Sequence, residues 1–162
     1  MRITPRLGGA RSAPYTLPSV ADQMIRAQDL KQVMNRYLVR LREYREALNR
    51  LNVYPVPDGD TGTNMTLTVE SVVAALDGVS SMPDVSQAMA RGSLMGAQGN
   101  SGIILSQILR AWADAFEKTR EVGPDELRVG LEQATAAAYK AVGRPVEGTI
   151  LTVLRQAAEE AA

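Results

Sequence analysis

Two aspartates separated by one glycine, Asp58 and Asp60, form the arrangement in this chain best suited to metal chemistry. Gly59 lets the backbone turn tightly enough for both carboxylates to face one ion. Such a pair suits Mg²⁺, which takes one or two carboxylates together with phosphate oxygens and water. A solvated Asp–Gly turn is the alternative, and the motif alone does not separate the two. The later acidic ligands of an EF-hand loop are absent, which excludes that calcium site.

Two glycine-containing stretches each lead into a predicted helix. Gly62-Thr63-Asn64 precedes one helix, and residues 96–102 (Gly-Ala-Gln-Gly-Asn-Ser-Gly) precede another. Free N–H groups and the helix dipole at such starts favour an anion, and small residues let phosphate oxygens approach the backbone. The second stretch lacks both the Lys of a Walker A loop and the preceding strand of a Rossmann fingerprint. Close helix packing and a C-cap are the alternative roles of its glycines.

A third loop covers residues 143–149 and contains two charged side chains. Arg144 could face a phosphate, and Glu147 could support such a contact from behind. The alternative is a Gly/Pro turn in which Thr149 is an ordinary N-cap of the final helix.

Composition narrows the chemistry further. The chain has no Cys and no His, which excludes disulfides, thiol nucleophiles, a Ser-His-Asp triad and Cys- or His-ligated metals. Its 18 basic and 18 acidic residues balance, which removes the electrostatic argument for binding nucleic acid or an anionic membrane. An oxygen-ligated metal beside two helix N-termini that suit a phosphate favours binding of a magnesium nucleotide and phosphoryl transfer. This reaction depends on positioning and charge neutralisation.

The elements that must position these loops are helices. Apolar residues recur at i, i+3, i+4 and i+7, no β alternation is convincing, and aromatics make up only 4%, which favours close packing through small residues. Pro55 and Pro57 end the first helix, Asp84 is the expected N-cap of the third, and glycines interrupt the chain before the fourth. The sequence therefore predicts an all-α fold with helices near 28–51, 64–76, 85–91, 102–116, 124–142 and 150–162.

Residues 1–24 differ from the rest of the chain. They combine Arg, Pro and Gly without a helical period, which predicts a disordered tail before a helical domain at 25–162. A transit peptide and a true start at Met24 are the alternatives. No apolar run reaches the roughly 18 residues that span a bilayer, and no signal-peptide core is visible. A cytoplasmic location is the resulting expectation.

Three ordered motifs resemble those of a known family. Residues 52–65 (Asn-Val-Tyr-Pro-Val-Pro-Asp-Gly-Asp-Thr-Gly-Thr-Asn-Met), 96–110 and 145–153 resemble the signatures of the L-subunit domain of dihydroxyacetone kinases. The sequence looks most like the branch at the N-terminus of bacterial fatty acid kinase catalytic subunits. The resemblance implies an antiparallel barrel of about eight helices that binds a nucleotide at one end. Six helices are expected here, so the resemblance implies a domain truncated at its C-terminus.

The resemblance also implies roles for particular residues. Asp58 and Asp60 would bind paired Mg²⁺ ions that bridge the ATP phosphates, with Asn52 as the nearest candidate for a third ligand, although its spacing is one residue longer than in the family. Ser101 and Gly102 would hold the phosphates from the second loop, and Ile150 would lie against the adenine. The full set of implied nucleotide contacts is Thr61, Gly62, Thr63, Asn64, Gly99, Asn100, Ser101, Gly102, Thr149 and Ile150.

The implied activity is ATP-dependent phosphorylation of a fatty-acid carboxylate held by a separate fatty-acid-binding protein of the DegV type. Thr61 stands where dihydroxyacetone kinases tend to have His, which favours the fatty acid branch. Phosphorylation of dihydroxyacetone remains an alternative, because the substrate-holding His of that system lies on a partner subunit. A non-catalytic helical module that keeps the ATP loops is the other alternative, since an incomplete barrel exposes apolar helix faces. The resemblance leaves a homodimer open.

Overall fold

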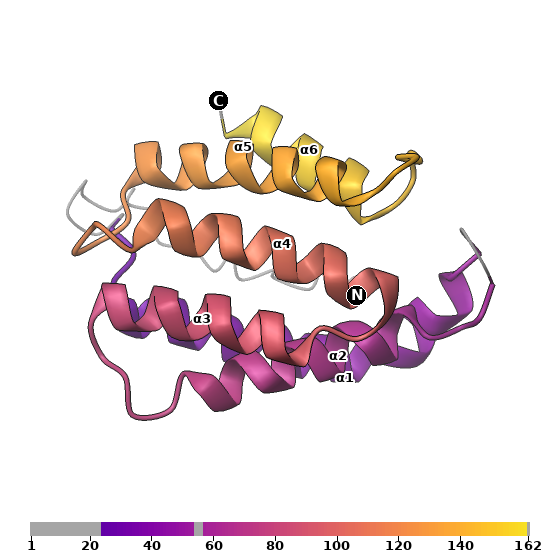
Figure 1. The fold of residues 1–162 in the computed structure, drawn as a ribbon, viewed down its shortest axis with the longest axis horizontal. Helices are drawn as coiled ribbons and strands as arrows, with labels where there is room; N and C mark the ends of the chain where they lie inside the picture. Colours follow the sequence, from indigo (N-terminus) through magenta and orange to yellow (C-terminus); the bar gives the residue numbers. More distant parts are fainter. Residues whose placement is uncertain (1–23, 54–56, 162) are drawn as a thin grey trace, which may run out of the picture.

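A computed structural model describes residues 24–53 and 57–161 of the chain, and within these ranges the protein is helical (Figure 1). The structure contains no strand there, only an isolated bridge between Ile25 and Val122. This confirms the predicted all-α class. Most of the predicted tail (1–23) and Pro55 lie outside the described residues. The helices are α1 (Ala27–Leu51), α2 (Thr61–Ala75), α3 (Met82–Gly96), α4 (Gly99–Phe116), α5 (Pro124–Ala141) and α6 (Ile150–Glu160).

Each helix runs antiparallel to the one before it and packs against it, and α2 also packs against α4 (Figure 1). This alternation has a direct consequence for the loops. The connections α1–α2, α3–α4 and α5–α6 all lie at one end of the bundle, on the right of Figure 1. The N-termini of α2, α4 and α6 therefore lie at this same end, which we call the loop end.

Two apolar clusters hold the helices together. The first joins α1 to α4 and includes the fully buried Val69, Val72 and Phe116. The second joins α4, α5 and α6 around Ala134, Ala138 and other buried residues of these helices. Trp112 and Ile150 pack against both clusters. Each large apolar side chain buried in this way contributes about 1.5–3 kcal/mol, and the small residues of the second cluster let α5 lie close to α4.

Glycine does not interrupt the chain where the sequence analysis expected it to. Gly92 and Gly96 lie inside α3, which continues to Gly96. A Cβ at Gly92 would lie only 2.8 Å from the Val72 Cα, and one at Gly96 would overlap the Ser71 side chain. Both glycines therefore let α3 approach α2 closely. The predicted break at Gly92 is therefore wrong, and at Gly96 the packing alternative is correct and the loop prediction is wrong.

Two predicted helix starts are also corrected. Helix α2 begins at Thr61 rather than near Asn64, so the Asp58–Asp60 loop is shorter than expected. Helix α3 begins at Met82 with Ser81 as its N-cap, and Asp84 lies in the first turn. The Ser81 hydroxyl accepts a hydrogen bond from the Asp84 backbone N–H (3.2 Å) and donates one to the Asp84 carboxylate (2.6 Å). Pro83 lies in this first turn, where proline is tolerated because its missing N–H costs nothing.

Replacing Ser81 with alanine is expected to destabilise the chain by about 1 kcal/mol, because the Asp84 N–H loses its acceptor. Thermal melting is expected to show a decrease of about 2–4 °C. The control is Ser80→Ala, a substitution at the exposed neighbouring position. Equal melting temperatures for the two variants would contradict the capping role.

Candidate functional site

Every residue that the sequence analysis singled out for metal or nucleotide binding lies at the loop end. Asp58 is exposed in the α1–α2 connection, and Asp60 is the half-buried N-cap of α2. The predicted phosphate contacts lie in first helical turns: residues 61–64 in α2 and residues 99–102 in α4. Thr149 is the N-cap of α6 and Ile150 its first residue. The predicted glycine loop before α4 is wrong in extent, since only Ala97 and Gln98 separate α3 from α4.

The carboxylate loop has an oxygen-rich donor set. The Asn52 side-chain N–H donates to the Asp58 carboxylate, which leaves the Asn52 amide oxygen free to accept. Gly59 between the aspartates adopts φ +67°, a conformation that glycine adopts without strain. Within the described ranges no three acidic, His or Cys side chains cluster closely enough to hold a metal by themselves. Two carboxylates and an amide oxygen fit Mg²⁺ whose remaining ligands are phosphate and water oxygens.

Asn49 is a residue of this site that the sequence analysis missed. Its side-chain oxygen accepts a hydrogen bond from the Thr63 backbone N–H, and its side-chain N–H donates to the Thr63 hydroxyl, both at 3.1 Å. Asn49 lies in the last turn of α1, so one helix caps the start of the next. The Asp60 carboxylate, although it is at the N-cap, makes no cap hydrogen bond. The Asp60 carboxylate is therefore not used to cap the helix, as a side chain at the N-cap position usually is.

The starts of α2 and α4 contact one another directly. The Thr68 hydroxyl donates to the Asn64 carbonyl (2.8 Å) and accepts from the Gln98 backbone N–H (3.3 Å), which joins α2 to the residue before α4. A Cβ at Gly99 would overlap the Asn64 side-chain amide, and one at Gly102 would lie against the Thr68 hydroxyl. These glycines thus serve close helix packing, and the contact places the first turn of α2 beside that of α4. The N–H groups at residues 63, 64 and 102 already have acceptors, so the N–H groups that remain for an anion are those earlier in each turn.

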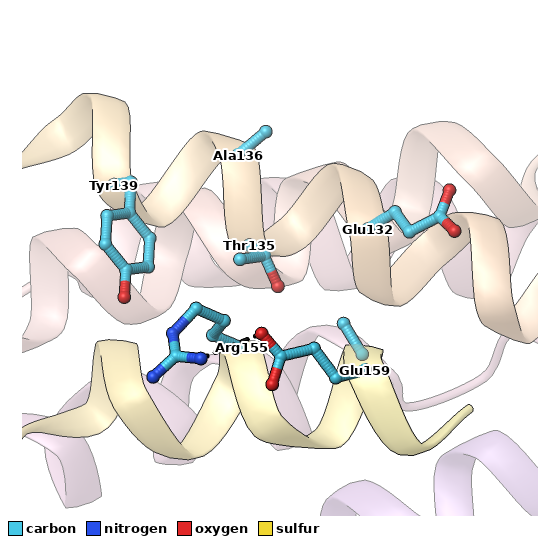
Figure 2. A pocket seen from close by; sticks show the side chains of 7 residues that line it. Glu132, Thr135, Ala136, Tyr139, Arg155 and Glu159 are labelled. Carbon is cyan, nitrogen blue, oxygen red and sulfur yellow. Dashed lines mark hydrogen bonds and ion pairs between the residues drawn. The ribbon is translucent and has the colours of Figure 1, made fainter. Parts of the chain in front are cut away.

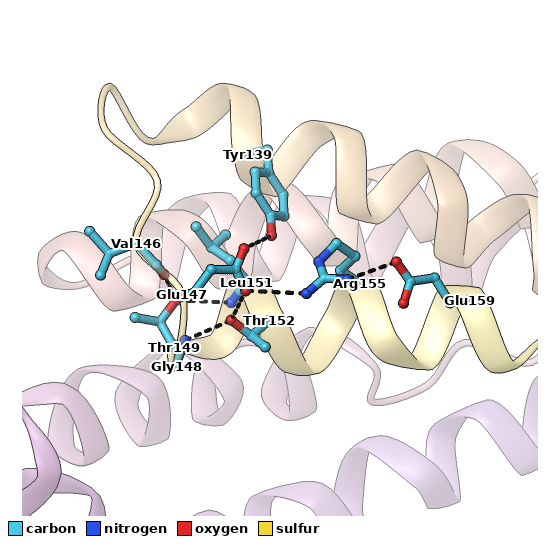
Figure 3. A network of polar contacts seen from close by, with 9 residues as sticks. All are labelled: Tyr139, Val146, Glu147, Gly148, Thr149, Leu151, Thr152, Arg155 and Glu159. Atoms are coloured by element: carbon cyan, nitrogen blue, oxygen red, sulfur yellow. Dashed lines mark hydrogen bonds and ion pairs between the residues drawn. The ribbon is translucent and has the colours of Figure 1, made fainter.

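The third loop is held by one carboxylate (Figure 3). Glu147 accepts hydrogen bonds from the Thr152 hydroxyl (2.6 Å), the Tyr139 hydroxyl (3.1 Å) and the Arg155 guanidinium (3.2 Å). These three hydrogen bonds hold the pKa of Glu147 below its usual value, and the one from Thr152 has the largest effect. Thr149 caps α6 as expected, because its hydroxyl oxygen accepts from the Leu151 N–H (3.3 Å). Arg144 is exposed in the same loop.

A groove of about 500 Å³ follows the line between α5 and α6 (Figure 2). Its lining is Glu132, Thr135, Ala136, Tyr139, Arg155, Ala158 and Glu159. None of the predicted metal or nucleotide residues borders it. The groove therefore lies on the flank of the bundle, and it adjoins the third loop through Tyr139 and Arg155, which also bind Glu147.

Comparison with known proteins identifies the class. The DAK2 domain family model matches residues 55–162. Over 117 residues the chain is 46% identical to Protein YloV of Bacillus subtilis, and over 118 residues 45% identical to an uncharacterized protein of Staphylococcus haemolyticus. These matches cover 71% and 72% of this chain but only 21% of either relative, so the chain spans about a fifth of their length.

The antiparallel helices and the three loops at one end thus define a class of domain that binds nucleotides. The chain belongs to the DAK2 domain family. This confirms the resemblance to dihydroxyacetone kinases at the level of the family. Within residues 24–53 and 57–161, no helix has both the length and the apolar character needed to cross a membrane.

Proposed function

We propose that this chain is a magnesium- and ATP-binding phosphoryl-transfer domain that acts on an acyl carboxylate. The observation that carries the proposal is the location of Asp58, Asp60 and the N-termini of α2, α4 and α6 at the same end of the bundle. Carboxylates at one side would hold Mg²⁺, and helical N–H groups would bind phosphate oxygens. Membership of the DAK2 domain family supports a nucleotide as the ligand.

In the proposed reaction, a carboxylate oxygen of the fatty acid attacks the γ-phosphorus of ATP. A new P–O bond forms, the bond from the γ-phosphorus to the β–γ bridging oxygen breaks, and ADP leaves with that electron pair. The products are an acyl phosphate and ADP. Bound Mg²⁺ would neutralise charge on the phosphates. The residues of this chain orient the nucleotide: Asp58 and Asp60 through the metal, and the first turns of α2 and α4 through their N–H groups.

The acyl carboxylate is favoured over an alcohol by the composition of the chain. A carboxylate is already ionised at neutral pH and needs no general base. The chain contains neither His nor Cys, and Thr61 occupies the first position of α2. An alcohol such as dihydroxyacetone would have to lose a proton to a base, a step that an acyl carboxylate does not need.

We propose further that the acyl chain is presented by a separate fatty-acid-binding protein in the cytoplasm. The loop end exposes four large apolar side chains, each at least two-thirds accessible: Leu51 (74%), Val53 (74%), Met95 (77%) and Val153 (67%). Apolar side chains around a charged site are typical of a surface that another protein covers.

Thermal melting of the full chain tests the nucleotide site. ATP with Mg²⁺, at about 100 times its Kd, is expected to stabilise the chain by roughly 2.7 kcal/mol and raise the melting temperature by about 5–10 °C. ATP with EDTA is expected to raise it much less. No shift with magnesium ATP would contradict the proposal and favour a non-catalytic helical module. In a second arm, ADP release is measured with a fatty acid on its binding protein and with dihydroxyacetone, and release only with the latter would contradict the acyl substrate.

A further inference from the structure

The first turn of α6 is held on its inner face by Leu151, which is buried, and by Ile150, which packs against both apolar clusters. Helix α6 packs on α5 and buries only Leu151, Leu154 and Ala158. The loop before it contains Gly143 and Gly148, and Gly148 adopts φ +79°. Apolar packing therefore holds the inner face of this turn, and the glycine-containing loop that leads into Thr149 needs a constraint of its own.

A polar network supplies the missing constraint (Figure 3). Glu147 lies in the loop, and its three donors come from two helices: Tyr139 from α5, and Thr152 and Arg155 from α6. One carboxylate thus connects the loop to the helix before it and to the helix after it. Arg155 is held in turn by Glu159 at 2.8 Å.

The Thr152 hydroxyl extends the network to the backbone. Its single proton goes to Glu147, so its oxygen lone pairs are free to accept, and they accept from the Gly148 N–H at 2.8 Å. Gly148 directly precedes Thr149. The orientation of the Thr152 hydroxyl, set by Glu147, therefore determines where the Gly148 N–H points and where the first turn of α6 begins.

The network is too exposed to be explained by stability. The side chain of Glu147 is 63% accessible and that of Arg155 is 38% accessible. Ion pairs in such positions contribute little to folding because water screens them. Converging donors on an exposed carboxylate fix geometry more effectively than they add stability.

We propose that Glu147 is a positioning residue that holds the first turn of α6 so that Thr149 and Ile150 face a nucleotide bound at the loop end. This inference rests on the proposed function. Glu147 acts through Thr152 and Gly148 and does not itself touch the nucleotide. The Thr149 hydroxyl donates to the Val146 carbonyl and accepts from the Leu151 N–H, so Thr149 would contact a ligand through its backbone.

The test is titration of the full chain with magnesium ATP, with the unliganded melting temperature measured in parallel. Glu147→Gln is expected to raise the Kd about tenfold, which corresponds to a loss of about 1.4 kcal/mol of binding free energy. Thr152→Val is expected to do the same, because it keeps the shape and removes the hydroxyl, whereas Thr152→Ser restores binding. The melting temperatures of all these variants are expected to stay within about 2 °C of the parent.

Glu159→Gln is the matched control. It removes one carboxylate that binds the same arginine, on the side of α6 away from the loop, and is expected to leave the Kd unchanged. Unchanged affinity in Glu147→Gln and Thr152→Val, with normal binding by the parent chain, would overturn the inference alone. A fall in melting temperature that accounts for the weaker binding would overturn it in favour of a structural role. Absence of binding by the parent would overturn the proposed function and this inference together.

Discussion

Replacing Asp60 with asparagine is expected to remove the magnesium-dependent stabilisation by ATP and to leave the unliganded chain folded. Asparagine is as good an N-cap as aspartate, and Asn49 already provides the hydrogen bond to the first turn of α2. The unliganded chain should lose only the interaction of the carboxylate with the helix dipole, about 0.3–1 kcal/mol. Because a neutral amide lacks the negative charge of one of the two carboxylates on which the Mg²⁺ site depends, the rise of about 5–10 °C expected for the parent chain should disappear.

Asp58→Asn is expected to have the same effect on the magnesium response. Asp58 is exposed, and its hydrogen-bond partner among the residues that the structure describes is the Asn52 side chain, so the substitution removes a charge without opening the core. The control is Asp77→Asn, an equally conservative change of an exposed carboxylate at the opposite end of the bundle. Asp77→Asn should respond to magnesium ATP like the parent. A full magnesium response in either loop variant would show that its carboxylate is not a ligand.

Gly62→Ala is expected to be the most destabilising single change among the loop-end glycines. A Cβ at Gly62 would overlap the carbonyl oxygen of Arg45 and lie 3.0 Å from its carbonyl carbon. Both atoms belong to the backbone of α1, so relief requires the two helices to separate. Alanine gains about 1 kcal/mol of helix propensity over glycine, but overpacking of this kind costs 1–3 kcal/mol and occasionally more. Since the obstacle is backbone, we expect a net loss of about 2 kcal/mol, or about 4–8 °C in melting temperature.

The same substitution tests the link between the α1–α2 contact and the site. Displacement of α2 would move Thr63 away from Asn49, so magnesium ATP should also bind more weakly to Gly62→Ala. The control is Gly143→Ala, where an added Cβ meets nothing within 4 Å and the backbone needs no left-handed conformation. That variant should melt within about 1–3 °C of the parent. A Gly62→Ala chain as stable as Gly143→Ala would contradict the close contact of α1 with α2.

Residue patterns in the sequence predict the helices but not all of their ends. The period of apolar residues gives the range of α1 to within a residue, and Pro124 and Thr149 mark the starts of α5 and α6. The start of α3 was misassigned because Pro83 resembles a helix breaker when its place in the first turn is unknown. The break expected at Gly92 was wrong because packing against Val72 outweighs the poor helix propensity of glycine.

The candidate site likewise has features that the sequence predicts and contacts that only the fold shows. The sequence by itself determined the all-helical class, the order of the three loops and the oxygen-only chemistry, because composition and short-range periodicity depend on neighbouring residues. Only the tertiary structure decided that Asn49 caps α2, that Gly62 meets Arg45, and that Glu147 joins α5 to α6. These contacts depend on which helices cross and how closely, and residues far apart in the chain carry no local signal of where the packing brings them together.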